Sequence, residues 1–206
     1  MLIGLTGLYC AGKNKIASLL EKRGLPVLDA DKLGHIVIES QKEAVFGLFG
    51  EDVKNPDGSV NRRLLGVKVF GKTGKLSALE ALIHPGVNRL IEEWVAAHSA
   101  AQNGNNCVIN AALLHKTTVF NSLDCIIIVS SPVITRLIRA KRRDNLPLTA
   151  LIKRLSTQKR FISQYLSVKT DIYKVENPGI GKNPGKIGTE TKLERRIDEI
   201  LLKLGL

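Results

Sequence analysis

A glycine-rich segment near the N-terminus has the residue types and spacing of a phosphate-binding loop. Gly7 is followed after four residues by Gly12 and Lys13, which gives the pattern G-x-x-x-x-G-K. Glycines let the backbone turn so that successive N–H groups point at one anion, and the lysine reaches the outer phosphates. The last position of this pattern normally carries Ser or Thr, whose hydroxyl binds Mg²⁺, but here it is Asn14.

The segments on either side of the loop are the ones that such a loop requires. An apolar run at residues 2–6 predicts a strand, and Ile16, Leu19 and Leu20 recur at helical spacing after the lysine. The helix would direct its positive dipole end at bound phosphates. A plain strand-to-helix turn with an incidental lysine is the alternative, because a chain with 18 glycines and 31 lysines plus arginines can meet the pattern by chance.

A second predicted strand ends in acidic residues. Residues 25–29 form a short apolar run that completes a βαβ unit, whose two strands should be parallel. Asp29 and Asp31 follow, and His35 lies on the next predicted helix. Ligands of open α/β sheets bind at the carboxyl ends of the strands, where these aspartates fall. Asp31 is equally well placed to cap the helix, so both roles remain open.

Three further predicted strands complete a sheet. Residues 107–114 and 124–130 are typical of parallel strands covered on both faces, residues 171–176 predict a last strand, and residues 190–204 predict an amphipathic helix. Five strands with interleaved helices predict an α/β three-layer sandwich around a five-stranded parallel sheet. We expect a single domain whose core comprises about residues 1–58 and 102–206.

A helical lobe is expected between the second and third strands. Residues 59–101 carry apolar residues at helical spacing, and the pair His84–Pro85 predicts a bend or a restart of the helix. Arg62 could face a ligand from this lobe, but a solvated helix face is the commoner role of such a residue.

The most basic segment, residues 136–158, is expected to form a lid. Arg136, Arg139 and Arg143 recur every three or four residues and therefore share one face of a helix. Arginine binds phosphate oxygens through paired hydrogen bonds. A row of arginines beside a phosphate-binding loop predicts a lid that closes on phosphates, whereas a solvated basic helix is the alternative.

Composition narrows the class of protein. The 206 residues are 44% hydrophobic and 24% charged, as in an ordinary globular protein. The net charge of +12 favours anionic partners such as nucleotides, but an aromatic content of only 4% argues against nucleic acid. No apolar stretch could span a membrane and no signal peptide is expected. Cys10, Cys107 and Cys125 should be reduced core thiols of a cytoplasmic protein.

The order of these segments resembles the dephospho-CoA kinase family along most of the chain. Each motif is weak alone, but a shared order is hard to obtain by chance. The motifs are IGLTG-x4-GK, VLDAD followed by His35, DGSVNRRLLGVKVF, LEALIHPGV, the Leu113–Leu114 pair, the arginine segment ending at Arg143–Asp144, RLSTQ, and D-I-Y-x-x-x-N.

This resemblance implies a P-loop kinase fold and a reaction. The γ-phosphoryl group of ATP would pass to the 3′-hydroxyl of dephospho-CoA, which is the last step of coenzyme A synthesis. ATP and Mg²⁺ would be the cofactors, and the partner would be this small-molecule substrate. The oligomeric state is not implied.

The resemblance also implies roles for individual residues. Lys13, Asp31 and Arg139 would be catalytic, with Asp31 accepting the proton of the acceptor hydroxyl or placing Mg²⁺ together with Asn14. The other residues at the nucleotide would be Gly7, Cys10, Ala11, Gly12, Lys15, Arg143 and Asn177, the last of them near the adenine. The other residues at the acceptor would be Thr6, His35, Arg62, His84 and Leu113.

Three positions depart from the family pattern. Asn14 replaces Ser or Thr, the third strand leads into Ala112 and the basic pair His115–Lys116 where the family has Pro-Leu-Leu and often Glu, and Asn177 lies one residue too far from Asp171. Three alternatives therefore stay open. They are another P-loop kinase with a nucleoside or nucleotide acceptor, a degenerate ATP-binding homologue with weak turnover, and a basic nucleic-acid binder.

Overall fold

A computed structural model describes residues 1–99, 106–158, 161–165, 169–178 and 188–206. The chain divides into two compact units, one of residues Met1–Leu28 with Ala97–Leu206 and the other of residues Asp29–Ala96. The second unit thus starts earlier in the chain than the lobe expected at 59–101, and residues 100–101 of that lobe lie outside the described residues. None of the helices in the described part is long and apolar enough to cross a membrane.

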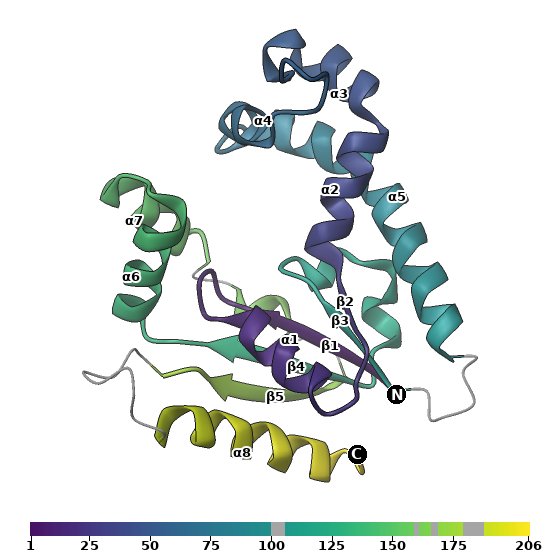
Figure 1. Ribbon diagram of the computed structural model, residues 1–206, viewed down its shortest axis with the longest axis vertical. Coiled ribbons are helices and arrows are strands. Elements are labelled where there is room, and N and C mark those ends of the chain that lie inside the picture. The colour runs from purple at the N-terminus through teal and green to yellow at the C-terminus, as the bar shows by residue number, and fades with distance from the viewer. Residues whose placement is uncertain (100–105, 159–160, 166–168, 179–187) are drawn as a thin grey trace. The chain divides into compact units, whose positions relative to one another are not determined.

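The first unit is built on a five-stranded sheet in the order β2-β3-β1-β4-β5 (Figure 1). β1 pairs in parallel with both β3 and β4, and β4 pairs in parallel with β5. This confirms the predicted α/β fold. The strands are β1 (Leu2–Gly7), β2 (Val27–Asp29), β3 (Cys107–Asn110), β4 (Cys125–Ser130) and β5 (Asp171–Glu176).

The third strand is shorter than the apolar run at 107–114 predicted, because β3 ends at Asn110. A turn and two 3-10 helices, Leu114–Lys116 and Thr118–Ser122, lead from there to β4. Leu114 is fully buried against β1, and its Cδ2 lies 2.6 Å from where a Cβ on Gly4 would stand. The run therefore stays apolar beyond the strand because Leu114 covers the sheet, and Gly4 leaves the space for it.

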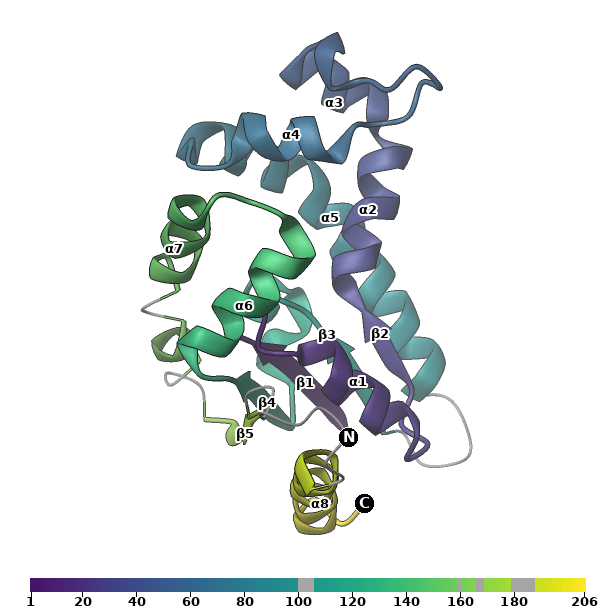
Figure 2. The same cartoon turned by 60° about the vertical axis from the view of Figure 1, so that its left-hand side comes forward.

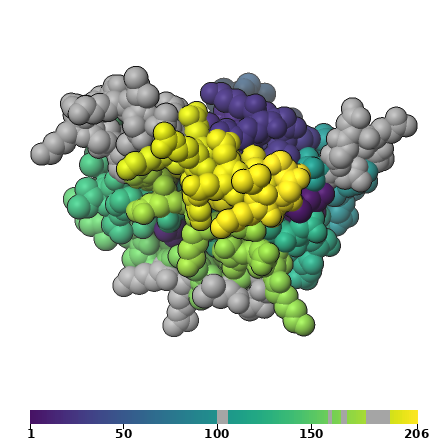
Figure 3. Space-filling model, turned by 90° about the horizontal axis from the view of Figure 1, so that it is seen from below, coloured from purple at the N-terminus to yellow at the C-terminus, as the bar shows by residue number. Residues whose placement is uncertain are grey.

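Two helices, α1 (Lys13–Glu21) and α8 (Gly188–Lys203), cover one face of the sheet. Figure 3 shows α8 in yellow along the surface of this unit. The Nε of Arg23, just beyond α1, donates to Asp198 Oδ1 of α8 at 2.5 Å. The apolar face predicted for the last helix is confirmed, since α8 buries Leu193, Ile197, Ile200 and Leu201 in the core of the first unit.

The basic segment forms two helices, α6 (Val133–Asp144) and α7 (Leu148–Ser156), which lie side by side (Figures 1 and 2). Asn145 ends α6 with a left-handed backbone at φ 49°, and Pro147 precedes the first turn of α7. After α7 the 3-10 helix Ile162–Gln164 brings the fully buried Tyr165 into the core. The phenol hydroxyl of Tyr165 lies 3.2 Å from His115 Nδ1.

The second unit consists of helices with their own apolar core, which includes Val45, Phe46, Val53, Leu65 and Leu79. Between α3 and α4 the chain forms the 3-10 helix Glu51–Val53 and a turn closed by the bridge between Lys54 and Val60. The helices are α2 (Ala30–Ser40), α3 (Lys42–Phe49), α4 (Arg62–Val69) and α5 (Thr73–Ser99).

Helix α5 runs through Pro85 as one continuous helix, so the predicted restart does not occur. The residue after this proline, Gly86, packs closely against α2. A Cβ on Gly86 would stand 2.9 Å from Cγ1 of Val37 in α2. The glycine therefore lets α2 and α5 approach closely at the residue that follows the proline.

Candidate functional site

The loop between β1 and α1 has the backbone of an anion site. Its turn is held by hydrogen bonds from Leu8 N to Val129 O at 3.0 Å and from Ala11 N to Leu8 O at 2.9 Å. Gly12 occupies the N-cap position of α1 with a left-handed φ of 96°, and the first turn of α1 carries no acidic residue. The positive end of the helix dipole is therefore available to an anion at the carboxyl end of the central strand.

One cysteine departs from the prediction. Cys107 and Cys125 are buried free thiols in strands, as predicted, and burial raises the pKa of Cys125 to about 12. Cys10 is only partly buried, because it lies in the loop with a left-handed φ of 59°. The prediction of a core thiol at this residue was wrong, since the apolar run that precedes it ends at the turn.

Asn177, expected at the nucleotide, and Arg139, expected as a catalytic residue, both contact the backbone of the loop. Asn177, directly after β5, is 6% exposed, and its Nδ2 donates to Ala11 O at 2.7 Å. Arg139 of α6 donates from Nη1 to the same carbonyl at 3.1 Å. The structure thus brings Arg139 and Asn177 to Ala11 and Gly12, although both residues lie far from the loop in the sequence.

The three arginines of α6 have different surroundings. Arg136 is 6% exposed, its Nε donates to Ser131 O at 3.1 Å, and burial lowers its pKa. Arg139 is half-buried behind the loop, and Arg143 is exposed at the end of the helix. The row is therefore not a uniform basic face, because its first member is part of the core.

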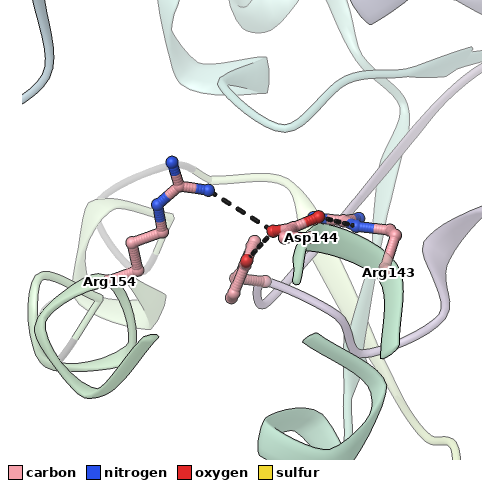
Figure 4. Close-up of polar contacts among 4 residues, drawn as sticks. Arg143, Asp144 and Arg154 are labelled. Carbon is pink, nitrogen blue, oxygen red and sulfur yellow. Dashed lines mark hydrogen bonds and ion pairs between the residues drawn. The ribbon is translucent and has the colours of Figure 1, made fainter. Parts of the chain in front are cut away.

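Asp144 joins the tip of the loop to both basic helices (Figure 4). Its carboxylate accepts a hydrogen bond from the hydroxyl of Tyr9, a bond from Arg143 Nε at 2.7 Å and a bond from Arg154 Nη1 of α7 at 3.4 Å. The guanidinium carbon of Arg143 also lies 5.0 Å from the centre of the Tyr9 ring, within cation–π range. Gln158 completes the contact by accepting Tyr9 N–H at 2.7 Å.

The Asp144 contacts predict a dependence of stability on pH. The hydrogen bond from Arg143, followed by the one from Tyr9, holds the pKa of Asp144 below its ordinary value of 3.8. The unfolded chain therefore binds this proton at a higher pH than the native protein does. The stability that Asp144 contributes is fully present above about pH 4 and is lost as the pH falls through the lowered native pKa.

We therefore expect Asp144→Asn to lower the free energy of unfolding by about 1–3 kcal/mol at pH 7 and to flatten its decline in acid. Urea unfolding of both proteins between pH 3 and pH 7 measures this. The difference between them should narrow toward pH 3, since every other carboxylate is shared. A difference that stays constant with pH would contradict the role given to the Asp144 charge.

Asn14 has a partner that the sequence did not reveal. Asn110, the last residue of β3, is 2% exposed, and its Nδ2 donates to Asn14 Oδ1 at 3.4 Å. Within the described residues Asn110 Oδ1 is buried without a hydrogen-bond partner. A buried amide oxygen left unpaired beside an anion-binding loop is well placed to bind a cation or its water. Part of the signal was available in the sequence, because β3 ends in the polar Asn110 at the same edge of the sheet at which β1 runs into the glycine-rich loop.

The other site residues that the sequence predicted in the first unit differ in their burial. Thr6 is fully buried, and its hydroxyl lies 3.4 Å from Tyr165 Oη and 3.5 Å from Ala112 O. Leu113 is 46% exposed in the turn after β3. Lys13 begins α1, and Lys15 is exposed in its first turn.

In the second unit the structure bears on one of the two roles that the sequence left open for Asp31, the capping of helix α2. Asp29 caps helix α2, because its Oδ1 accepts hydrogen bonds from Asp31 N at 3.1 Å and Lys32 N at 3.4 Å. Asp31 lies inside the first turn and is exposed. The capping interpretation of Asp31 was therefore wrong, and its carboxylate faces solvent at the start of the helix.

The second unit contains a pocket of about 600 Å³ that brings His35 and Arg62 together. Partial burial, followed by the charge of Arg62, lowers the pKa of His35. Two arginines at the N-terminus of α4 make this pocket suitable for an anionic group. His84 is half-buried on α5 and is not part of the lining. The lining residues are His35, Ile36, Glu39, Asn55, Ser59, Val60, Asn61, Arg62 and Arg63.

Comparison with known sequences gives a consistent match. Residues 1–172 match a family model described as dephospho-CoA kinase. A dephospho-CoA kinase of Treponema pallidum is 32% identical over 100% of this chain and 96% of its own length. A dephospho-CoA kinase of Treponema denticola is 33% identical over 86% of this chain and 82% of its own length.

Solved structures agree with this match. A protein from Thermus thermophilus superimposes with a TM-score of 0.76 at 28% identity, covering 99% of this chain and 97% of that one. A dephospho-CoA kinase from Campylobacter jejuni superimposes with a TM-score of 0.68, covering 98% of this chain and 96% of that one. Its identity of 18% supports the fold alone.

Proposed function

We infer the function from the premise that this chain belongs to the dephospho-CoA kinase family. It is an ATP-dependent phosphotransferase, which transfers the γ-phosphoryl group of ATP to the 3′-hydroxyl of dephospho-CoA and so forms CoA. The observation that carries this inference is the family match across residues 1–172, joined to a glycine-rich loop whose helix N-terminus is free of acidic residues.

Phosphoryl transfer requires positioning and positive charge more than covalent chemistry from the protein. We assign the charge to Lys13, to the backbone N–H groups at the start of α1 and to Arg143. These groups would stabilise negative charge on the phosphate oxygens as it develops. Their support is local, since Lys13 follows Gly12 directly and Arg143 packs over the Tyr9 ring of the same loop.

Asn14 and Asn110 would hold Mg²⁺. Amide oxygens are hard ligands that suit this ion, and the unpaired, buried Asn110 Oδ1 gives an independent reason to expect a cation there. Across the described residues no three His, Cys, Asp or Glu side chains gather into a metal site. Bound Mg²⁺ would neutralise charge on the phosphates, and the negative charge that retains the ion would come largely from the nucleotide, because both amides are neutral.

Asn14→Ser tests this assignment. A serine restores the shorter hydroxyl ligand that the loop pattern usually carries, so we expect the Mg²⁺ concentration for half-maximal activity to fall severalfold. The Mg²⁺ concentration at which ADP raises the melting temperature should fall by the same factor, which measures the ion without turnover. An unchanged Mg²⁺ requirement in both assays would show that the residue at position 14 does not contact the metal.

We assign the acceptor to the second unit. Asp31, exposed in the first turn of α2, would accept the proton of the 3′-hydroxyl and help to place Mg²⁺. The pocket with His35 and Arg62 would take an anionic part of dephospho-CoA, whose diphosphate suits the arginines that line it.

The deciding experiment measures ADP release from Mg²⁺-ATP with dephospho-CoA and adenosine as parallel acceptors. Turnover with dephospho-CoA alone is expected. Turnover with adenosine at a similar rate would identify a nucleoside kinase instead. Binding of ATP without ADP release in either reaction would identify a degenerate nucleotide-binding homologue, for which the replacement at Asn14 would be the first cause to examine.

A further inference from the structure

We propose that Asn177 and Arg139 are positioning residues that hold the phosphate-binding loop from outside and thereby aim a backbone N–H group at the phosphates. The proposal rests on the proposed function, because it concerns the same ATP site. It assigns Asn177 to the loop and not to the adenine, and it assigns Arg139 to the loop and not to the transferred phosphate.

The backbone of Asn177 is held in place independently of its contact with the loop. Its backbone N–H donates to Ser130 O at 2.8 Å, which anchors it beside the end of β4. Its side chain is buried, and Nδ2 donates to Ala11 O at 2.7 Å. A Cβ on Gly12 would stand 2.1 Å from that Nδ2, so the loop and the amide occupy adjoining space that only glycine permits. Residues of both segments, Asn177 after β5 and Gly12 in the loop, are therefore suited to this contact.

Arg139 supports the same carbonyl from α6. Its Nη1 donates to Ala11 O at 3.1 Å and to Cys10 O at 3.5 Å. Its Nη2 donates to Asn177 Oδ1 at 3.4 Å and to Pro178 O at 3.2 Å. Both terminal nitrogens therefore bind protein oxygens. This arrangement joins α6, the segment after β5 and the loop into one hydrogen-bonded network.

The consequence for the loop follows from peptide geometry. In a planar trans peptide group the C=O and the next N–H point in opposite directions. Holding Ala11 C=O toward Asn177 and Arg139 therefore turns the Gly12 N–H away from them, toward the inner side of the loop at the start of α1. Left-handed backbone at Cys10, with a φ of 59°, is unfavourable for a residue other than glycine and is stabilised by such external contacts, whereas Gly12 adopts its φ of 96° without strain.

The test compares two ligands that share the phosphates but differ in the adenine. Inorganic tripolyphosphate and ATP are titrated calorimetrically into the wild-type chain, Asn177→Ala and Asn177→Asp. Aspartate is isosteric and can still accept a bond from Arg139, but it lacks the Nδ2 donor and repels the carbonyl. We expect each variant to raise the dissociation constants of tripolyphosphate and of ATP by a common factor, about tenfold for Asn177→Ala and more for Asn177→Asp, whose added negative charge also repels both anions.

Glu176→Ala is the matched control, because Glu176 is the exposed neighbour of Asn177 at the end of β5. It should leave both dissociation constants unchanged. Melting temperatures are recorded for every variant. A role confined to stability would lower the melting temperature and leave both constants of the folded protein unchanged, and this result would overturn the proposal. Asn177→Asp keeps the test available if the alanine variant fails to fold.

Comparing the dissociation constants of the two ligands distinguishes the proposal from a role of Asn177 at the adenine. Weaker ATP binding with unchanged tripolyphosphate binding would place Asn177 at the adenine and overturn the proposal. A double-mutant cycle with Arg139→Ala should show that the second substitution adds little, because both residues hold one carbonyl. Fully additive losses would place Arg139 on the phosphates instead. No acceptor is present in these titrations, so a failure of the dephospho-CoA assay would leave their outcome unaffected.

Discussion

Replacing Lys13 by alanine is expected to lower kcat/KM for ATP by about 10²–10³-fold, mainly through kcat. Lys13 is the first residue of α1, directly after the left-handed Gly12. Its ammonium group would follow the negative charge that moves onto the outer phosphate oxygens in the transition state, where a fixed positive charge stabilises most. Steady-state ADP release with dephospho-CoA measures the loss.

Lys22→Ala is the control for this prediction, because Lys22 lies at the other end of the same helix and is exposed. It removes the same charge from the chain without approaching the loop, so activity should be retained. Urea unfolding of both variants should give free energies close to wild type. Near-normal activity in Lys13→Ala would mean that the loop is an ordinary strand-to-helix turn.

The sequence predicted those parts of the fold that depend on local pattern. Apolar runs located four of the five strands, and the spacing of Leu193, Ile197 and Ile200 located the buried face of α8. It failed where a tertiary contact determines the outcome. Leu114 continues an apolar run past the end of β3 because it covers β1, and α5 continues through Pro85 where α2 packs against Gly86.

The candidate site also has parts that local sequence predicts and parts that depend on tertiary contacts. The loop could be predicted because its glycines and lysine are adjacent in sequence and their roles are set by backbone geometry. The contact between Asn177 and Ala11 could not, because it joins residues that are 166 positions apart. Asn110 is an intermediate case, since its place at a strand end is a local fact but its unpaired oxygen beside Asn14 is a tertiary one.

The second large effect is expected at the start of α2, where Asp29 caps the helix and Asp31 is the proposed proton acceptor. We expect Asp31→Asn to lower kcat by about 10²–10⁴-fold, since an amide of the same shape cannot accept the proton of the acceptor hydroxyl. The helix should survive, because Asp29 supplies the side-chain cap to Asp31 N and Lys32 N. The loss of one carboxylate near the helix N-terminus should cost at most about 1 kcal/mol of stability.

Asp29→Ala is the comparison variant for Asp31→Asn, because it should affect stability and not turnover. Removing the cap should lower the free energy of unfolding by about 1 kcal/mol, whereas Asp31→Asn should change activity far more than stability. Measuring kcat and urea unfolding for both variants shows which aspartate affects turnover and which affects stability. Near-normal turnover in Asp31→Asn would reduce Asp31 to a residue that only complements the helix dipole, and the proton acceptor would have to be sought elsewhere in the chain.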